Sequence, residues 1–151
     1  MNWKIILIGG VVFYVVIFLL SFVTAMVVHE QILAATYMAT AQFWRPELMS
    51  DPPDMAALLP RWVTTGLIGA FIMAGIYDHV RSSFTGPGWQ RGLKFGFVLS
   101  LLAAAFFAGM SGAFNLPDNV WVWWSVETLV LYLVAGAVLG VVVDKLAPRA
   151  A

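Results

Sequence analysis

Few side chains in this sequence can carry chemistry, because its 151 residues include only two histidines and no cysteine. The lack of cysteine excludes disulfides, thiolate metal sites, iron–sulfur clusters, covalent haem attachment and a cysteine nucleophile. No nucleophile and base stand at a recognisable catalytic spacing. The sequence therefore does not favour an enzyme, and we expect no cofactor.

The most informative residue is Glu127, an acid within an otherwise apolar stretch. A carboxylate inside a bilayer is costly, so it is expected to face protein or water. Two interpretations remain open. Glu127 is a structural acid, protonated or paired with Arg61, Ser111, Asn115 or an indole N–H, or it belongs to a ligand, proton or ion site.

His29 and Glu30 close the first apolar stretch on the side of the membrane from which Glu127 enters. One histidine with two carboxylates is a set that can bind a metal ion or relay protons. A pair of solvated interfacial residues is the simpler interpretation, and we favour it. The candidate ligand or ion residues are Glu127, His29, Glu30 and Asn115, and the sequence does not identify a metal.

Four predicted membrane helices must position these residues. The chain is 62% hydrophobic and 11% charged, whereas soluble domains carry about 45–50% apolar and about 25% charged residues. A membrane helix needs about 20 mostly apolar residues, and such stretches lie at about 5–28, 62–77, 93–114 and 120–143. We therefore expect an all-α integral membrane four-helix bundle, as a single domain over residues 1–151.

Aromatic and basic residues support these boundaries and predict an orientation. Six tryptophans fall at predicted helix ends, where an indole prefers the membrane interface: Trp3, Trp62, Trp89, Trp121, Trp123 and Trp124. One side of the membrane collects most of the basic residues: Lys4, Arg81, Arg91, Lys94, Lys145 and Arg149. The opposite side has Arg45 and Arg61. The positive-inside rule then places both termini in the cytoplasm.

The long loop after the first span is expected to contain helix. No helix breaker occurs before about Trp44, so the chain is predicted to stay helical beyond the membrane or along its surface. Arg45-Pro46 is predicted to end this helix, because the residue before a proline disfavours the α conformation. A short helix is then expected from Asp51, as N-cap, to Pro60.

Small residues at four-residue spacing predict close helix contacts, since lipid supplies no hydrophobic drive between helices. The predicted packing residues are Gly66, Ala70, Ala74, Gly109, Gly136 and Gly140. Contacts within one bundle explain most of this pattern, and a homo-oligomer interface is the alternative. The basic residues Arg81, Arg91 and Lys94 are expected to set topology or to contact anionic lipid.

Several short runs support a family resemblance. The residues are His29-Glu30-Gln31-Ile32-Leu33, Tyr37, Trp44-Arg45-Pro46 and the run from Gly86 to Gly96. With these runs the chain resembles small four-helix bacterial inner-membrane proteins of uncharacterised function. The resemblance spans most of the chain and implies the topology above, but it implies no activity and no site residues.

The sequence as a whole favours a non-enzymatic component of a bacterial inner membrane. We expect an accessory or assembly role, as a homo-oligomer or within a larger membrane complex, with a polar site near the outer surface. The alternative is a small transporter or an ion- or ligand-binding protein that uses Glu127 with His29 and Glu30. The expected partner is the lipid bilayer, and the zero net charge gives no reason to expect nucleic acid.

Overall fold

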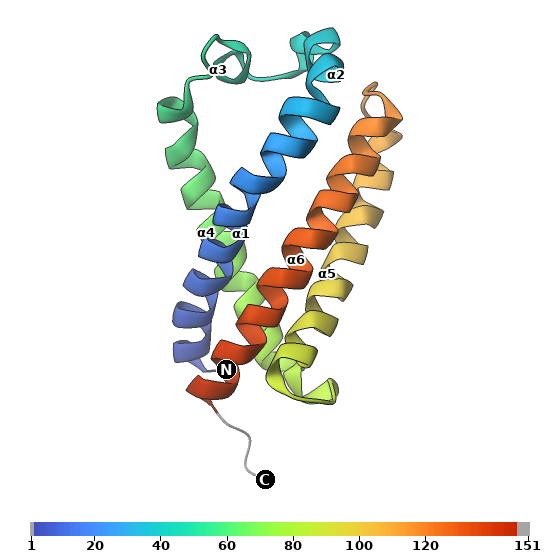
Figure 1. Ribbon diagram of the computed structural model, residues 1–151. Coiled ribbons are helices and arrows are strands. Elements are labelled where there is room, and N and C mark those ends of the chain that lie inside the picture. The colour runs from blue at the N-terminus through green and yellow to red at the C-terminus, as the bar shows by residue number, and fades with distance from the viewer. Residues whose placement is uncertain (1, 148–151) are drawn as a thin grey trace.

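Four long apolar helices dominate the computed structural model, which describes residues 2–147 (Figure 1). Each is long and apolar enough to cross a membrane. The first span, Ile5–Ile32, consists of η1 (Ile5–Gly9), α1 (Gly10–Val27) and η2 (Val28–Ile32). The other three are α4 (Met55–Val80) with η4 (Arg81–Ser83), α5 (Gly88–Ser111) and α6 (Asp118–Leu146). The predicted all-α four-helix membrane bundle is thereby confirmed. We call the end with residues 33–54 the loop end, and the end with Asn2 and Ala147 the terminal end.

The second span begins earlier than predicted. The carboxylate of Asp54, and not of Asp51, accepts a hydrogen bond from the Ala57 amide at 3.1 Å and caps α4. Pro60 therefore lies inside this helix and does not end a separate one. A proline removes one helical hydrogen bond, but only the first turn of α4 precedes it. The helix therefore continues, and the prediction of a short helix from Asp51 to Pro60 is wrong.

The long loop (residues 33–54) is helical in pieces. After Leu33 the chain forms α2 (Ala34–Ala39), η3 (Ala41–Phe43) and α3 (Pro46–Met49). Thr40 interrupts the first two pieces, and its hydroxyl donates to the Thr36 carbonyl at 2.8 Å, a local bond that competes with regular helix. Pro46 begins α3 instead of merely ending the preceding helix, since proline suits the first helical position.

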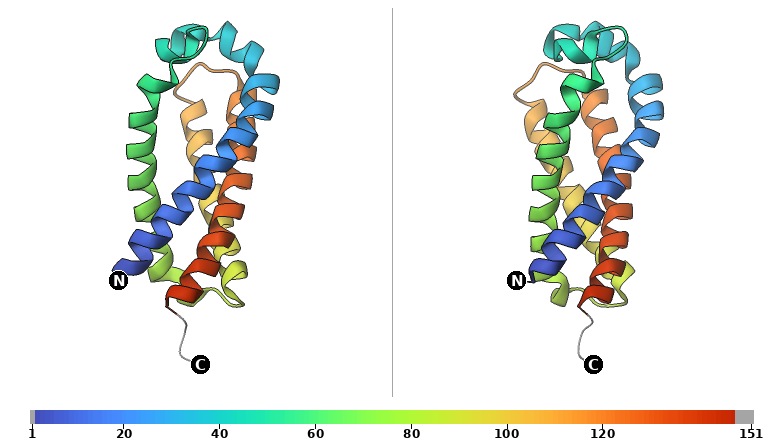
Figure 2. Two further views of the ribbon diagram at one scale, coloured as in Figure 1. Left: turned by 60° about the vertical axis from the view of Figure 1, so that its left-hand side comes forward. Right: turned by 90° about the vertical axis from the view of Figure 1, so that its left-hand side faces the viewer.

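The closest packing in the molecule joins α5 to α6, which lie side by side in every view (Figures 1 and 2). A Cβ atom added at Gly92 would collide with the backbone carbonyl of Gly136, and one at Gly140 with that of Gly88. Gly96 is equally tight against the Tyr132 carbonyl. Only residues without a side chain allow two helix backbones to approach so closely.

The first half of the first span packs against α4. Gly10 lies against the Phe71 ring, and Gly66 lies against the Tyr14 ring. Ala70 is also buried on the same helix, with Ala74 one turn further along. Of the predicted packing residues, Gly109 differs: it is exposed, and a Cβ added there meets no other atom within 4 Å.

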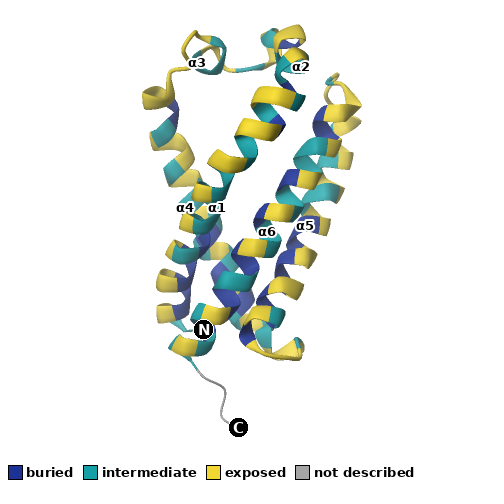
Figure 3. Ribbon diagram, viewed as in Figure 1, coloured by how far each residue is buried: buried dark blue, intermediate teal, exposed yellow. Residues whose placement is uncertain are grey.

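The main hydrophobic core lies toward the terminal end (Figure 3). There α4 approaches α5, and the rings of Tyr77 and Phe95 lie 5.1 Å apart. Toward the loop end the first span leaves α4 and lies against α6 (Figure 2). A smaller buried cluster of Val28, Leu33 and Val120 joins these two helices at the loop end. The bundle is therefore tight at one end and spread at the other.

We predict that Gly92→Ala destabilises the protein by about 1–3 kcal/mol, because its methyl group must displace a backbone carbonyl and not a flexible side chain. The matched control is Gly109→Ala, which has open space around it and should be neutral or slightly stabilising through helix propensity. Thermal unfolding of both variants in the same detergent measures the difference. Equal melting temperatures would contradict the described contact between α5 and α6.

Candidate functional site

The Glu127 carboxylate is the centre of the candidate site, and both of its oxygens are bonded. Glu127 lies on α6 and is 9% exposed. The hydroxyl of Thr24 donates to Oε1 at 2.5 Å, and Nε2 of His29 lies 3.0 Å from Oε2. Buried carboxylates are tolerated when they are paired and hydrogen-bonded. The first span therefore supplies what makes an acid acceptable within the bilayer.

The two partners of the carboxylate lie on either side of a change in helix type. Thr24 lies in α1, whereas His29 lies in the π-helical segment η2. Residues five apart point in clearly different directions on an α-helix, but a π-helix has a wider turn with bonds five residues apart. The amide of Leu33 accordingly donates to the carbonyl of Val28 at 2.9 Å. Such π segments occur often at functional sites.

The ion pair continues into a chain of hydrogen bonds toward the long loop. Nδ1 of His29 lies 2.7 Å from the Tyr37 hydroxyl, and that oxygen accepts the indole N–H of Trp124 at 2.9 Å. Burial raises the pKa of Tyr37, and the charge of Glu127 acts in the same direction, against the lowering effect of the Trp124 hydrogen bond. A protonated phenol can therefore donate to Nδ1 while Nε2–H donates to the carboxylate, which pairs each of these donors with an acceptor.

Two further hydrogen bonds involve the long loop close to Tyr37. Asn119, in the first turn of α6, donates to the Thr36 hydroxyl at 3.0 Å. The indole of Trp44 donates to the Thr40 hydroxyl at 2.9 Å, and its ring lies 4.9 Å from that of Tyr37. Thr36 of α2 is thus bonded to α6, and Trp44 is held against α2 with its ring 6.0 Å from that of Trp124 on α6.

The structure brings together two of the four residues proposed from the sequence, Glu127 and His29. Glu30 is exposed, and its carboxylate forms no ion pair with any residue between 2 and 147. Asn115 is exposed in the turn between α5 and α6, and Asn119 makes the polar contact instead. Within the described part of the chain, no group of three or more His, Cys, Asp or Glu residues could hold a metal ion.

Three members of the site were not proposed as site residues: Thr24, Tyr37 and Trp124. Thr24 could have been found from the sequence, because it and Ser21 are the only two aliphatic hydroxyl residues in the first span. Trp124 stands three residues before Glu127, and residues at that spacing share a helix face. An indole N–H was considered as a partner for Glu127, but that of Trp124 bonds Tyr37 instead. Tyr37 could not be placed without knowing how the long loop folds back.

Polar contacts also join the helices at the terminal end. Arg91 is 6% exposed and forms an ion pair with Asp144 on α6, and its other terminal nitrogen donates to the Gly86 carbonyl at 3.0 Å. The Asp78 carboxylate accepts from the Asn2 amide at 2.7 Å. Arg91 was expected to set topology or to contact lipid, but burial against α6 leaves it little access to a headgroup.

No protein-family model, curated protein or solved structure matches this chain. Its four long apolar helices define it as a multi-pass membrane protein. The resemblance to small four-helix bacterial proteins stays a hypothesis, and the role of Glu127 has to be argued from its surroundings.

We predict that His29 and Glu127 are energetically coupled by about 1.5–3 kcal/mol, the range for hydrogen bonds to charged groups. The experiment is a double-mutant cycle with His29→Gln, Glu127→Gln and the double variant, followed by thermal unfolding in one detergent. Glu47→Gln is the control, because its ion pair with Arg45 is exposed and exposed pairs contribute little to stability. Additive effects of the two substitutions would contradict the ion pair.

Proposed function

We propose that this chain is a non-enzymatic accessory or assembly component of a bacterial inner membrane. The observation that carries the proposal is that both carboxylate oxygens of Glu127 are already bonded by the same chain, to Thr24 and to His29. With a bond to each oxygen and only 9% of the residue exposed, the carboxylate is satisfied within the chain and offers little access to an external ligand. The buried acid serves instead as an anchor that holds the loop end together.

The bonds of Glu127 help to hold the long loop in place. His29, Tyr37 and Trp124 form one bonded unit that joins the first span, α2 and α6. Ordered in this way, the loop presents apolar side chains on its outside: Met38 is 72% exposed and Phe43 is 47% exposed. A preorganised surface binds a partner at lower entropic cost than a mobile one. We place the contact with a partner protein there.

The orientation proposed is the one with both termini in the cytoplasm. Asn2 bonds Asp78, and the Ala147 carbonyl accepts from Arg81 at 3.0 Å, so both termini lie at one end of the bundle. That end also holds Lys4, Arg91, Lys94 and Lys145, whereas the loop end has Arg45 and Arg61. Basic residues collect on the cytoplasmic side of multi-pass proteins. The long loop is then outside.

The order hydroxyl, imidazole and carboxylate in Tyr37, His29 and Glu127 is also that of hydrolytic triads. Its chemistry here differs, because the phenol oxygen already accepts the N–H of Trp124. Burial also raises the pKa of Tyr37 and so favours the neutral phenol, which is a weak nucleophile. The arrangement accordingly favours a structural or proton-carrying role over covalent catalysis.

A second candidate is a proton pathway, because the same groups form a continuous chain. It runs from Tyr37 in the long loop through His29 to a carboxylate embedded in α6. Hydrogen-bonded acids and histidines of this kind carry protons in membrane pumps and transporters. Between Glu127 and the terminal end, other groups would have to carry the proton. Residues 2–147 contain no second acid in the middle of a span.

The accessory role predicts that the protein purified from its own membrane in mild detergent travels with a partner. Native mass spectrometry should detect a complex larger than one chain. Glu127→Gln should reduce the complex several-fold, because the long loop loses its attachment. The control Gly109→Ala lies on an exposed face of α5 and should leave the complex intact. A bare monomer for the wild-type protein would contradict the proposal.

The proton pathway predicts a different result in reconstituted vesicles. Vesicles that carry the wild-type protein should acidify faster than empty ones under an imposed pH gradient, and Glu127→Gln should abolish the difference. A pH-sensitive dye inside the vesicles measures the rate. Equal rates for wild-type, Glu127→Gln and empty vesicles exclude this second candidate without affecting the first.

A further inference from the structure

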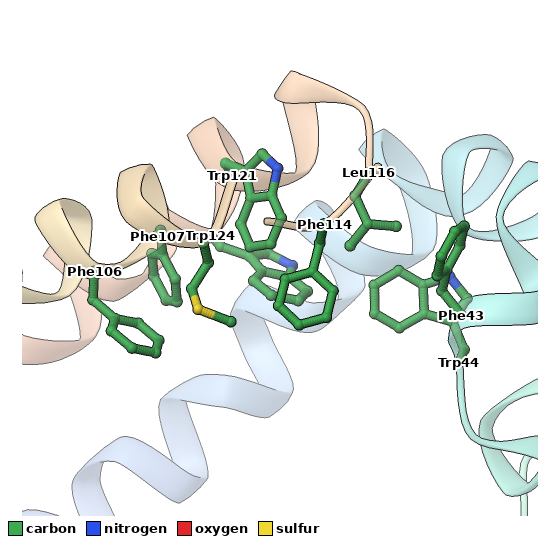
Figure 4. A pocket seen from close by; sticks show the side chains of 9 residues that line it. Phe43, Trp44, Phe106, Phe107, Phe114, Leu116, Trp121 and Trp124 are labelled. Carbon is green, nitrogen blue, oxygen red and sulfur yellow. The ribbon is translucent and has the colours of Figure 1, made fainter. Parts of the chain in front are cut away.

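A groove of about 270 Å³ opens beside the polar site at the loop end (Figure 4). It is lined almost entirely by rings and apolar side chains from α5, α6 and the long loop: Phe43, Trp44, Phe106, Phe107, Met110, Phe114, Leu116, Trp121 and Trp124. Its size is just under the range of about 300–1,000 Å³ that is usual for pockets of drug-sized ligands. A small organic molecule therefore matches the space.

Several rings of the groove meet edge to face instead of stacking in parallel. Three of them contact Trp124: Trp44 at 6.0 Å between centroids, Phe107 at 5.8 Å and Trp121 at 5.7 Å. Their planes are inclined to that of Trp124 by 63°, 66° and 78° respectively. Edge-to-face contacts hold these rings in fixed positions, so the groove has a rigid aromatic lining, to which a quaternary ammonium group can bind through cation–π attraction.

Two of the three indole N–H groups in this groove are hydrogen-bonded, and these bonds hold their rings in place; the third, that of Trp121, is buried and has no partner among residues 2–147. The indole N–H of Trp124 donates to Tyr37, and that of Trp44 donates to Thr40. The groove therefore presents ring carbon to its occupant, with little capacity for hydrogen bonding. An anion or a sugar would lose its hydration without compensation. A large, weakly hydrated cation loses little and gains the attraction of the rings.

The charge of the loop end also favours a cation. Its only basic residues are Arg45 and Arg61, and Arg45 is paired with Glu47 at 2.8 Å. The Arg45 guanidinium holds the pKa of Glu47 below its ordinary value, so this acid is charged at neutral pH. The acids of this end outnumber its bases: Glu30, Glu47, Asp51, Asp54, Asp118 and Glu127. A surface of one sign raises the local concentration of ligands of the opposite sign.

We propose that the aromatic groove at the loop end binds a small hydrophobic organic cation, such as one with a quaternary ammonium group, which enters from the aqueous side. The cationic group sits among the rings of Phe107, Trp121 and Trp124, and its apolar part extends toward Phe114. The groove shares Trp124 with the hydrogen-bond chain of Glu127 and Phe43 with the outer face of the long loop, and cation binding is tested independently of the accessory role.

The probe for this site is benzyltrimethylammonium, and its uncharged counterpart of the same shape is neopentylbenzene. Binding is measured by calorimetry in nanodiscs of phosphatidylethanolamine and phosphatidylglycerol, which lack choline headgroups, with empty nanodiscs as reference. The wild-type protein should bind the cation saturably. Neopentylbenzene should show only the partitioning that empty nanodiscs show.

The variant Phe107→Leu/Phe114→Leu keeps the groove apolar but removes two rings, and we expect it to weaken cation binding by about tenfold. The matched control is Phe97→Leu, a substitution on α5 at a ring that is 48% exposed and does not line the groove. It should bind the cation as the wild-type protein does. Melting temperatures of the two variants show that both are folded before binding is compared.

Three outcomes would overturn the proposal. Saturable binding of neopentylbenzene with the affinity of the cation would make the groove a site for apolar chains, such as those of lipids. Unchanged cation binding by Phe107→Leu/Phe114→Leu would place the cation elsewhere. A wild-type protein that binds no cation beyond the empty nanodisc would leave the groove without this function.

Discussion

The structure depends first on the backbone contact between α5 and α6. Lipid is as apolar as the helix surfaces, so burial of leucine or phenylalanine between helices gains little, and close packing must hold them together. Gly92 and Gly136 allow the two backbones to touch, with Gly88, Gly96 and Gly140 on either side. The first span packs against this pair of helices, and α4 is attached through that span and through the contact of its Tyr77 with Phe95 on α5.

Glu127 determines where the loop end of the first span lies. An acid within a bilayer must be satisfied by protein or water, and here Thr24 and His29 provide its bonds. Glu127 lies on a different face of α6 from the glycines. It is nine residues before Gly136, which corresponds to about 180° of helix rotation. One helix therefore holds α5 by backbone contact and the first span by charge.

The two ends of the bundle use polar groups differently. At the terminal end, Arg91 and Asp144 pair where the helices are packed most tightly, and Asn2 bonds Asp78. At the loop end the polar chain reaches aromatic rings, and the helices spread. Buried aromatic residues with a bonded polar tip are suited to a membrane interface. The spread end combines rigid rings with accessible space, which is what a binding surface requires.

The sequence by itself determined the number of spans, the all-α class and the importance of Glu127, because bilayer thickness sets the helix length and a buried charge is conspicuous in an apolar stretch. It did not determine which faces meet. Gly109 and Gly136 look alike in the sequence, yet only Gly136 touches a neighbouring backbone. The partners Thr24 and Tyr37 depended on which face of the first span meets α6 and on how the long loop folds back. Helix rotation and crossing arise from all contacts together, so only the tertiary structure decided them.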